Sequence, residues 1–221
     1  MRREPPHHTQ QVGDPPVTDC PTMPCRVCGR QIRRPTPVCF CCRVVARQLG
    51  LPLVPTVAAA DYRLGDAGHL RLRGYKDAPT ARLRALHRGV IARTLDDWLD
   101  HNTAALVDRF GAWSVVAPVP STRRAGPPPA GALLDEVPTL AGVHLDLLSR
   151  GSGTADHLAA CRNGFALLPG VDRAGLDGLP VLVFDDSVTT GARSQSAAAT
   201  LRLGGAHVVG VLAVGRALPA A

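Results

Sequence analysis

Apolar residues in this chain fall into short continuous runs and longer periodic stretches, a pattern typical of strands alternating with helices. Helical spacing covers residues 79–110, as one long helix or two, and an alanine- and serine-rich segment at 192–203 predicts a further helix. Strand, helix and strand in succession from 181 to 214 predict a right-handed parallel crossover, and therefore an α/β fold. Four apolar runs have the length of buried strands, and they lie at 113–119, 143–148, 181–184 and 208–214.

Two further segments have a less regular pattern. Residues 61–72 mix apolar residues with Arg and Gly, and we expect a strand or an irregular segment there. Residues 130–141 predict a short helix, although Pro138 interrupts it. Only 4% of the residues are aromatic, so the predicted core must consist mainly of Leu, Val and Ala.

The chain divides into three parts. Residues 1–19 hold four prolines and no apolar periodicity, so we expect a disordered tail. Residues 20–50 form a cysteine-rich module, and Pro52 and Pro55 then mark a linker. Residues 56–217 are enough for one sizeable α/β domain.

The cysteine-rich module contains two Cys-x-x-Cys pairs, Cys25/Cys28 and Cys39/Cys42, with ten residues between them. Four thiolates at this spacing predict a closed tetrahedral site for a structural Zn²⁺ ion. Cys41 is an alternative to Cys42 as the fourth ligand. Disulfides are a weaker interpretation for a cytoplasmic protein.

Charge allows an anionic partner but does not require one. The chain has a net charge of +7, and 24 of its 25 basic residues are arginine, with Lys76 the single lysine. The positive charge is concentrated in residues 1–50 and 61–93, where it can meet a nucleotide, a phosphosugar or nucleic acid. No apolar run has the length of a membrane span and no signal peptide opens the chain, so we expect a cytoplasmic protein without membrane insertion.

The most informative segment joins the apolar run at 181–184 to the helix at 192–203. Asp185 and Asp186 follow the run, and a Thr-Thr-Gly turn at 189–191 leads into the helix. A helix N-terminus presents unpaired N–H groups and partial positive charge, both of which suit a phosphate. The carboxylates can accept hydrogen bonds from ribose hydroxyls or hold Mg²⁺ beside a pyrophosphate. The pattern therefore predicts a phosphosugar site at the carboxyl ends of the strands.

This segment resembles the phosphoribosyl pyrophosphate (PRPP) signature of type I phosphoribosyltransferases over Val181 to Arg193. It departs from the signature at Ser187, where an apolar residue is usual, and at Arg193, where Thr or Ser is usual. The resemblance gives Asp185 and Asp186 the catalytic positions beside the ribose hydroxyls and Mg²⁺. It implies a 5′-phosphate loop made of five residues, Thr189, Thr190, Gly191, Ala192 and Arg193.

Together with the four cysteines, the signature makes the chain similar to the ComF/GntX-like family, which is linked to natural competence and DNA uptake. Residues 72–77, Leu-Arg-Gly-Tyr-Lys-Asp, resemble a family segment, which implies that Lys76 faces the pyrophosphate. The Pro-Val-Pro at 118–120 and the stretch at 156–165 resemble further family segments. The implied fold is a type I phosphoribosyltransferase-like parallel sheet flanked by helices, with a small zinc-binding module before it.

The loop at 121–129 departs from the family, since a basic and proline-rich sequence replaces the usual continuation after Pro-Val-Pro. We therefore expect binding of PRPP, or of a phosphoribosyl nucleotide, to be better preserved than turnover. Three functions remain open at this point. They are a phosphoribosyltransferase, a nucleotide-sensing protein without turnover, and an adaptor that binds single-stranded DNA or competence proteins.

Overall fold

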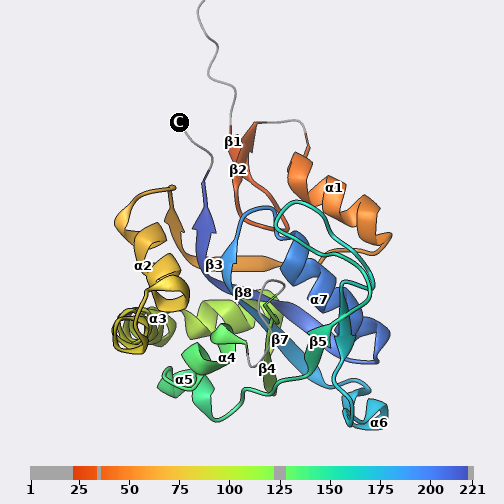
Figure 1. The fold of residues 1–221 in the computed structure, drawn as a ribbon. Helices are drawn as coiled ribbons and strands as arrows, with labels where there is room; N and C mark the ends of the chain where they lie inside the picture. The colour runs from red at the N-terminus through yellow and green to blue at the C-terminus, as the bar shows by residue number, and fades with distance from the viewer. Residues whose placement is uncertain (1–21, 34–35, 122–127, 219–221) are drawn as a thin grey trace, which may run out of the picture.

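A four-stranded parallel sheet forms the centre of the computed structural model, which describes residues 22–33, 36–121 and 128–218 (Figure 1). The strand order is β3-β8-β7-β4, and every pairing between neighbours is parallel. The two central strands, β7 and β8, contain the longest apolar runs, as expected for strands buried on both faces. The bounds are Thr56–Tyr62 for β3, Val115–Pro118 for β4, Pro180–Val188 for β7 and His207–Ala217 for β8.

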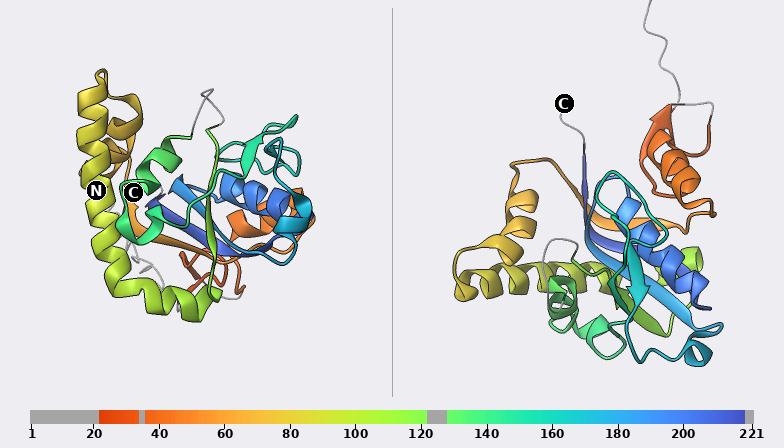
Figure 2. Two further views of the ribbon diagram at one scale, coloured as in Figure 1. Left: turned by 90° about the horizontal axis from the view of Figure 1, so that it is seen from below. Right: turned by 45° about the vertical axis from the view of Figure 1, so that its right-hand side comes forward.

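Helices cover both faces of the sheet (Figure 2). The helices α2 (Ala67–Asp77) and α3 (Ala81–Phe110) pack on one face, and α7 (Ala192–Leu203) packs on the other. Successive side chains of β7 alternate between the two, because Leu182 belongs to the core beneath α3 and Val183 to the core beneath α7. The sheet thus separates two apolar layers.

The predicted helix and strand at the end of the chain are confirmed. The helix over 192–203 is α7, and its almost wholly buried alanines and serines allow it to lie close against β7 and β8. Gly215 of β8 shows the same close packing, since a Cβ atom there would lie 2.8 Å from side-chain atoms of Leu72 and Tyr62. Small residues therefore let the strands and helices around the sheet's carboxyl edge approach each other.

The remaining elements are short. The hairpin β1 (Thr22–Pro24) and β2 (Gln31–Arg33) precedes α1 (Phe40–Leu49), which packs beside α7. A second hairpin consists of β5 (Leu148–Arg150) and β6 (Phe165–Leu167). Three short helices complete the described part, α4 (Pro129–Leu134), α5 (Pro138–Ala141) and α6 (Arg173–Leu176). The proposed tail at 1–19 lies outside the described residues.

Several local predictions need correction. Residues 61–72 contain the end of β3 and the start of α2, a helix that Asp66 begins by accepting a hydrogen bond from the His69 N–H at 2.8 Å. Of the two alternatives for residues 79–110, the single long helix is confirmed, since α3 covers Ala81–Phe110. Residues 130–141 contain two helices, because the chain turns before Pro138. The run at 143–148 contributes a single bridge to Val116 and the first residue of β5.

Candidate functional site

The acidic pair lies within β7 rather than after it. Pairing of β7 with β4 stops at Phe184, whereas pairing with β8 continues to Val188. Asp185 and Asp186 therefore stand where β7 has lost one neighbour, at the carboxyl edge of the sheet. Both residues are buried, at 2% and 5% exposure. Because successive strand residues point to opposite faces, Asp186 faces α2 and Asp185 faces the side covered by α7.

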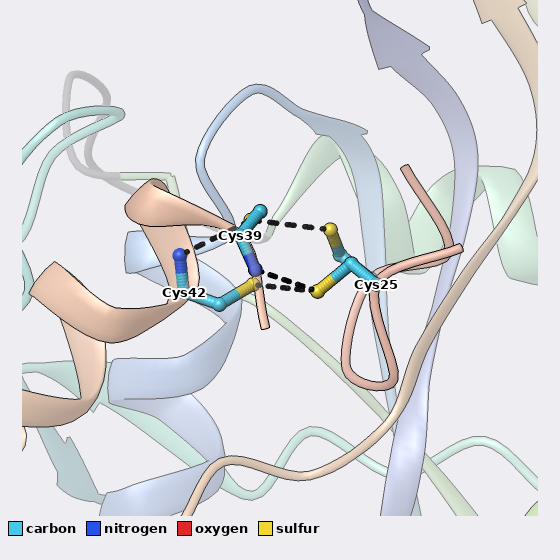
Figure 3. Close-up of side chains that lie close together, drawn as sticks. Cys25, Cys39 and Cys42 are labelled. Atoms are coloured by element: carbon cyan, nitrogen blue, oxygen red, sulfur yellow. Dashed lines mark hydrogen bonds between the residues drawn. The ribbon is translucent and has the colours of Figure 1, made fainter. Parts of the chain in front are cut away.

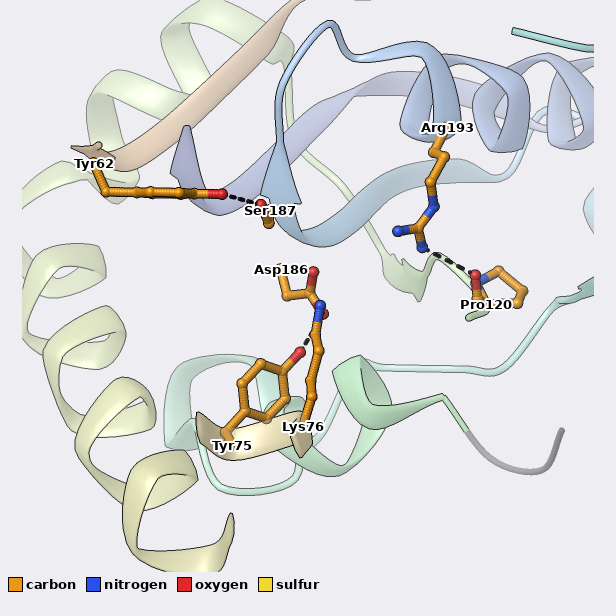
Figure 4. Close-up of polar contacts among 7 residues, drawn as sticks. All are labelled: Tyr62, Tyr75, Lys76, Pro120, Asp186, Ser187 and Arg193. Carbon is orange, nitrogen blue, oxygen red and sulfur yellow. Dashed lines mark hydrogen bonds and ion pairs between the residues drawn. The ribbon is translucent and has the colours of Figure 1, made fainter. Parts of the chain in front are cut away.

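Asp186 is held by two consecutive residues of α2 (Figure 4). The Nζ atom of Lys76 lies 2.5 Å from Oδ2 of Asp186, and the hydroxyl of Tyr75 donates a hydrogen bond to the same oxygen. Burial alone would raise the pKa of Asp186, but the charge and hydrogen bond of Lys76, with the Tyr75 hydroxyl, lower it below its ordinary value. Asp186 is therefore a carboxylate at neutral pH.

Asp185 has a different environment. Burial raises its pKa to about 6, although the positive charge of Arg193 opposes this shift. The charge of Asp185 in turn raises the pKa of Arg193. The Arg193 guanidinium leaves the first turn of α7 and donates a hydrogen bond to the Pro120 carbonyl at 3.1 Å (Figure 4). Arg193 thus links the first turn of α7 to Pro120, which follows β4.

The turn between β7 and α7 is shaped by Thr190 and Gly191. Gly191 has φ +81°, a left-handed conformation that favours glycine. The Thr190 hydroxyl accepts from the Ala192 N–H at 3.2 Å and donates to the His157 carbonyl at 2.6 Å. The hydroxyl thereby stabilises the turn that precedes α7 and fixes the segment around His157 beside the turn.

A cavity of about 500 Å³ opens at this edge of the sheet, with α2, the β7–α7 turn and residues 156–157 among its walls. Thr190 does not line it and instead borders a smaller cavity beside the cysteine module. The other proposed ligand-binding and catalytic residues all line the large cavity, namely Lys76, Asp185, Asp186, Thr189, Gly191, Ala192 and Arg193.

Two polar atoms near this cavity have no hydrogen-bond partner among the described residues. They are Oδ1 of Asp186 and Nε of Arg193, and both are buried. One is an acceptor and the other a donor, and their residues line the same cavity. Buried polar atoms are rarely left unpaired, and such exceptions are a reason to look for a ligand or an ordered water.

Sequence reasoning did not identify several residues of the site. Tyr75 adjoins Lys76 in sequence, but its role depends on α2 being a helix. Tyr62 bonds through its hydroxyl to Ser187, at the position where the signature usually has an apolar residue. Gln195 gave a visible signal, since it is a long polar side chain in an alanine-rich segment. It is buried, and it bonds to the Val54 backbone and to the Thr56 hydroxyl.

The four cysteines of the two Cys-x-x-Cys pairs form one cluster (Figure 3). All four sulfur atoms lie within 4.8 Å of one another, with 3.9 Å between those of Cys25 and Cys42 and 3.8 Å between those of Cys28 and Cys39. A tetrahedron with Zn–S bonds of about 2.3 Å has sulfur atoms about 3.8 Å apart. The four residues therefore fit a zinc ion. Cys42, and not Cys41, is the fourth member of the cluster.

Backbone N–H groups support the cluster as well. The Cys39 N–H donates to the Cys25 sulfur at 3.3 Å, and the Cys42 N–H donates to the Cys39 sulfur at 3.4 Å. A hydrogen bond with Cys42 lowers the pKa of Cys28 to about 5, whereas burial raises the pKa of Cys39 to about 11. The cluster thus presents sulfur ligands inside a preformed backbone frame.

The cysteine module contacts the turn between β7 and α7 directly. The guanidinium of Arg30 donates to the carbonyls of Thr189 and Ala217, both at 3.3 Å. At the other end of the module, Arg162 donates to the carbonyls of Leu49 and Gly50, the latter at 3.0 Å. Hydrogen bonds of Arg30 therefore connect the module that carries the four cysteines to Thr189, in the wall of the large cavity.

Comparison with known proteins adds no family to these observations. No protein-family model matches the chain, and a search of curated proteins found no matching sequence. Within the described residues, no helix is both long and apolar enough to cross a membrane. The features above define an α/β protein that has a four-stranded parallel sheet flanked by helices. The chain adds to this sheet an N-terminal cluster of four cysteines able to hold a structural zinc ion.

Proposed function

We propose that this protein binds PRPP or a related phosphoribosyl ligand in the cavity at the carboxyl edge of its sheet. The observation that carries the proposal is the buried acidic pair beside the N-terminus of α7, with an unpaired acceptor on Asp186 and an unpaired donor on Arg193. A ligand rich in hydroxyl and phosphate oxygens satisfies both kinds of atom. The fold we propose is that of a type I phosphoribosyltransferase of the ComF/GntX-like family.

Each part of the ligand has a matching region of the cavity. The 5′-phosphate lies against the first turn of α7, where backbone N–H groups and the helix dipole favour negative charge. The ribose hydroxyls donate to Asp185 and Asp186. The pyrophosphate lies toward α2, where the side chains of Lys76 and Arg73 line the same cavity.

The proposal rests on binding of the ligand rather than on transfer of its ribose phosphate. In transfer, the bond from the ribose carbon to pyrophosphate breaks and a bond to an acceptor forms, so the leaving group needs positive charge more than a nucleophile. Lys76 supplies such a charge. The sequence after Pro120 departs from the family, and its residues 122–127 lie outside the described part of the chain.

The test is calorimetric titration of the purified protein with PRPP and, separately, with ribose 5-phosphate. Asp186→Asn keeps the shape of the side chain but weakens its acceptance from ribose hydroxyls, and we expect a loss of affinity of about tenfold or more. Asp108→Asn is the matched control, because Asp108 is exposed on α3. Equal affinity in both variants, or no binding by the native protein, would contradict the proposal.

An activity assay separates binding from turnover. PRPP is incubated with the protein and a panel of purine and pyrimidine bases, and pyrophosphate release is measured. We expect release to be slow or absent for the native protein, alongside measurable binding of PRPP. Rapid base-dependent release that disappears in Asp185→Asn would establish a transferase.

A second candidate function is binding of single-stranded DNA in a competence system. Arg71, Arg73 and Arg82 are exposed on α2 and at the start of α3, which supports an electrostatic contact with phosphates. Affinity for an oligonucleotide should then fall steeply with salt, because neutralised phosphates release counterions. A location in the cytoplasm, where thiols stay reduced, suits both functions and the cysteine cluster.

A further inference from the structure

The acidic pair has its own cation on each face of β7. Asp186 faces α2, and the Lys76 ammonium lies 2.5 Å from its Oδ2 atom. Asp185 faces the side of α7, where the Arg193 guanidinium is the positive charge with the largest effect on it. Two side-chain cations, Lys76 and Arg193, therefore act on the two carboxylates.

This arrangement does not fit the Mg²⁺ ion that the resemblance implies. Mg²⁺ requires close octahedral coordination by oxygen, and it is usually held by carboxylates that converge on one point. Asp185 and Asp186 leave the strand on opposite faces, so they do not converge. Oδ2 of Asp186 already receives Lys76 and the Tyr75 hydroxyl. Among the described residues, the four cysteines are the only group of three or more His, Cys, Asp or Glu side chains with metal-ligand spacing.

Charge leads to the same conclusion. A divalent cation near the acidic pair would approach both Lys76 and Arg193, and the carboxylates' negative charge is already met by these two side chains. Lys76 and Arg193 would then offer N–H donors to the phosphates of a ligand without any ion from solution. Arg193 is well placed for this, because its Nε atom is buried without a partner and its side chain lines the cavity.

We propose that Lys76 and Arg193 take the place of the divalent cation at this site, so that the protein binds metal-free PRPP. This inference rests on the proposed function. It assigns the site a ligand class, the free pyrophosphate ester rather than its Mg²⁺ complex. It also gives the Arg193 side chain a role in replacing the cation, in addition to the place of Arg193 in the 5′-phosphate loop.

The experiment measures PRPP affinity by calorimetry with and without millimolar MgCl₂. The metal-free buffer is prepared by passage over a chelating resin, since a soluble chelator would attack the cysteine cluster, and zinc content is measured before and after. We expect the two dissociation constants to agree within about threefold, with Mg²⁺ giving no tightening. A tightening by Mg²⁺ of about tenfold or more would overturn the inference while leaving the proposed function in place. Absence of binding under both conditions would overturn the proposed function and the inference together.

Variants test whether the two side chains replace the ion. Arg193→Thr and Lys76→Met each remove one cation, and Mg²⁺ should now tighten PRPP binding by about tenfold. Arg173→Thr, on the exposed surface of α6, should remain insensitive to Mg²⁺. Thermal unfolding checks that each variant folds, and Lys76→Arg keeps the charge if Lys76→Met does not fold. A folded Arg193→Thr or Lys76→Met protein that stays insensitive to Mg²⁺ would overturn the role assigned to that side chain.

Discussion

The four-cysteine cluster and the acidic pair are both gatherings of groups that can become anions, but they differ in how their charge is met. The thiols of Cys25, Cys28, Cys39 and Cys42 form hydrogen bonds with one another, and backbone N–H groups donate to the Cys25 and Cys39 sulfur atoms. The nearby Arg30 donates to carbonyls of the α/β domain instead. The acidic pair, by contrast, has two side-chain cations beside it, Lys76 and Arg193. Internal cations thus distinguish the acidic pair from the cysteine cluster, whose four residues fit a structural zinc ion.

Removal of the metal should give the largest effect. Structural zinc contributes about 10–16 kcal/mol of apparent binding free energy in small zinc modules, so its loss should unfold the cysteine module. Cys25→Ser should bind well below one zinc per chain and should lower the melting temperature. Elemental analysis and thermal unfolding measure both quantities. Cys41→Ser is the control, and loss of zinc from that variant would show that the ligand set is different.

Loss of the Lys76 charge should give the next largest effect. Lys76→Met leaves Asp186 buried without its cation, which usually costs about 3–5 kcal/mol. We expect about 2–4 kcal/mol here, because the Lys76 side chain is 26% exposed and water screens the pair in part. Urea unfolding at neutral pH measures the change. A double-mutant cycle with Asp186→Asn should return most of this energy as coupling, and additive effects of the two changes would refute the pairing.

The pH dependence of stability should distinguish Asp185 from Asp186. The folded-state pKa of Asp185 is raised from 3.8 to about 6, so the folded protein binds more protons than the unfolded chain between these values. Asp185 therefore favours folding at low pH, and its contribution is lost as pH rises from about 4 to 6. Asp185→Asn removes this loss. Its stability relative to the native protein should rise by about 2–3 kcal/mol between pH 4 and pH 7. Urea unfolding across this range measures it, and a difference that stays flat with pH would contradict the assignment.

The smallest effect concerns the contact of Arg30, in the cysteine module, with the α/β domain. Arg30→Ala removes two hydrogen bonds to carbonyls of Thr189 and Ala217, worth about 1 kcal/mol or slightly more. We also expect PRPP affinity to fall by about threefold, because the phosphate loop loses a support. Arg33→Ala, on the exposed β2 strand, serves as the control. The same loss in both variants would point to general charge rather than to this contact.

The sequence predicted the parts of the molecule that depend on local pattern. The spacing of the cysteines predicted their cluster, and the buried strand–helix–strand run predicted β7, α7 and β8. The helix α2 was missed because only Leu72 and Tyr75 are buried along it, which gives little helical periodicity. The strand β3 was missed because Ala58 and its alanine neighbours have weak strand preference, and pairing with β8 determines their conformation.

Local pattern did not predict which side chains contact each other within the site. Tyr75 and Asp186 are 111 positions apart, so only the packing of α2 on the sheet brings them together. The signature predicted that Thr190 would contact a phosphate, and this remains a prediction. Its hydroxyl already bonds to Ala192 and His157, which no local pattern indicates. Residue types led to the prediction of a phosphosugar site, which stays a prediction, whereas the counter-ions of the acidic pair came from tertiary structure.

The hydrogen bonds of Arg30 have a thermodynamic consequence for the whole chain. Arg30 belongs to the segment that carries the cysteine ligands, yet it contacts Thr189 at the mouth of the cavity and Ala217 at the end of β8. A ligand that stabilises this conformation of Thr189 also stabilises the conformation of Arg30. Linkage is reciprocal, so the factor by which zinc strengthens ligand binding is the factor by which the ligand strengthens zinc binding. Occupancy of the cavity should therefore raise the affinity of the cysteine cluster for its metal, even though the two sites share no ligand atom.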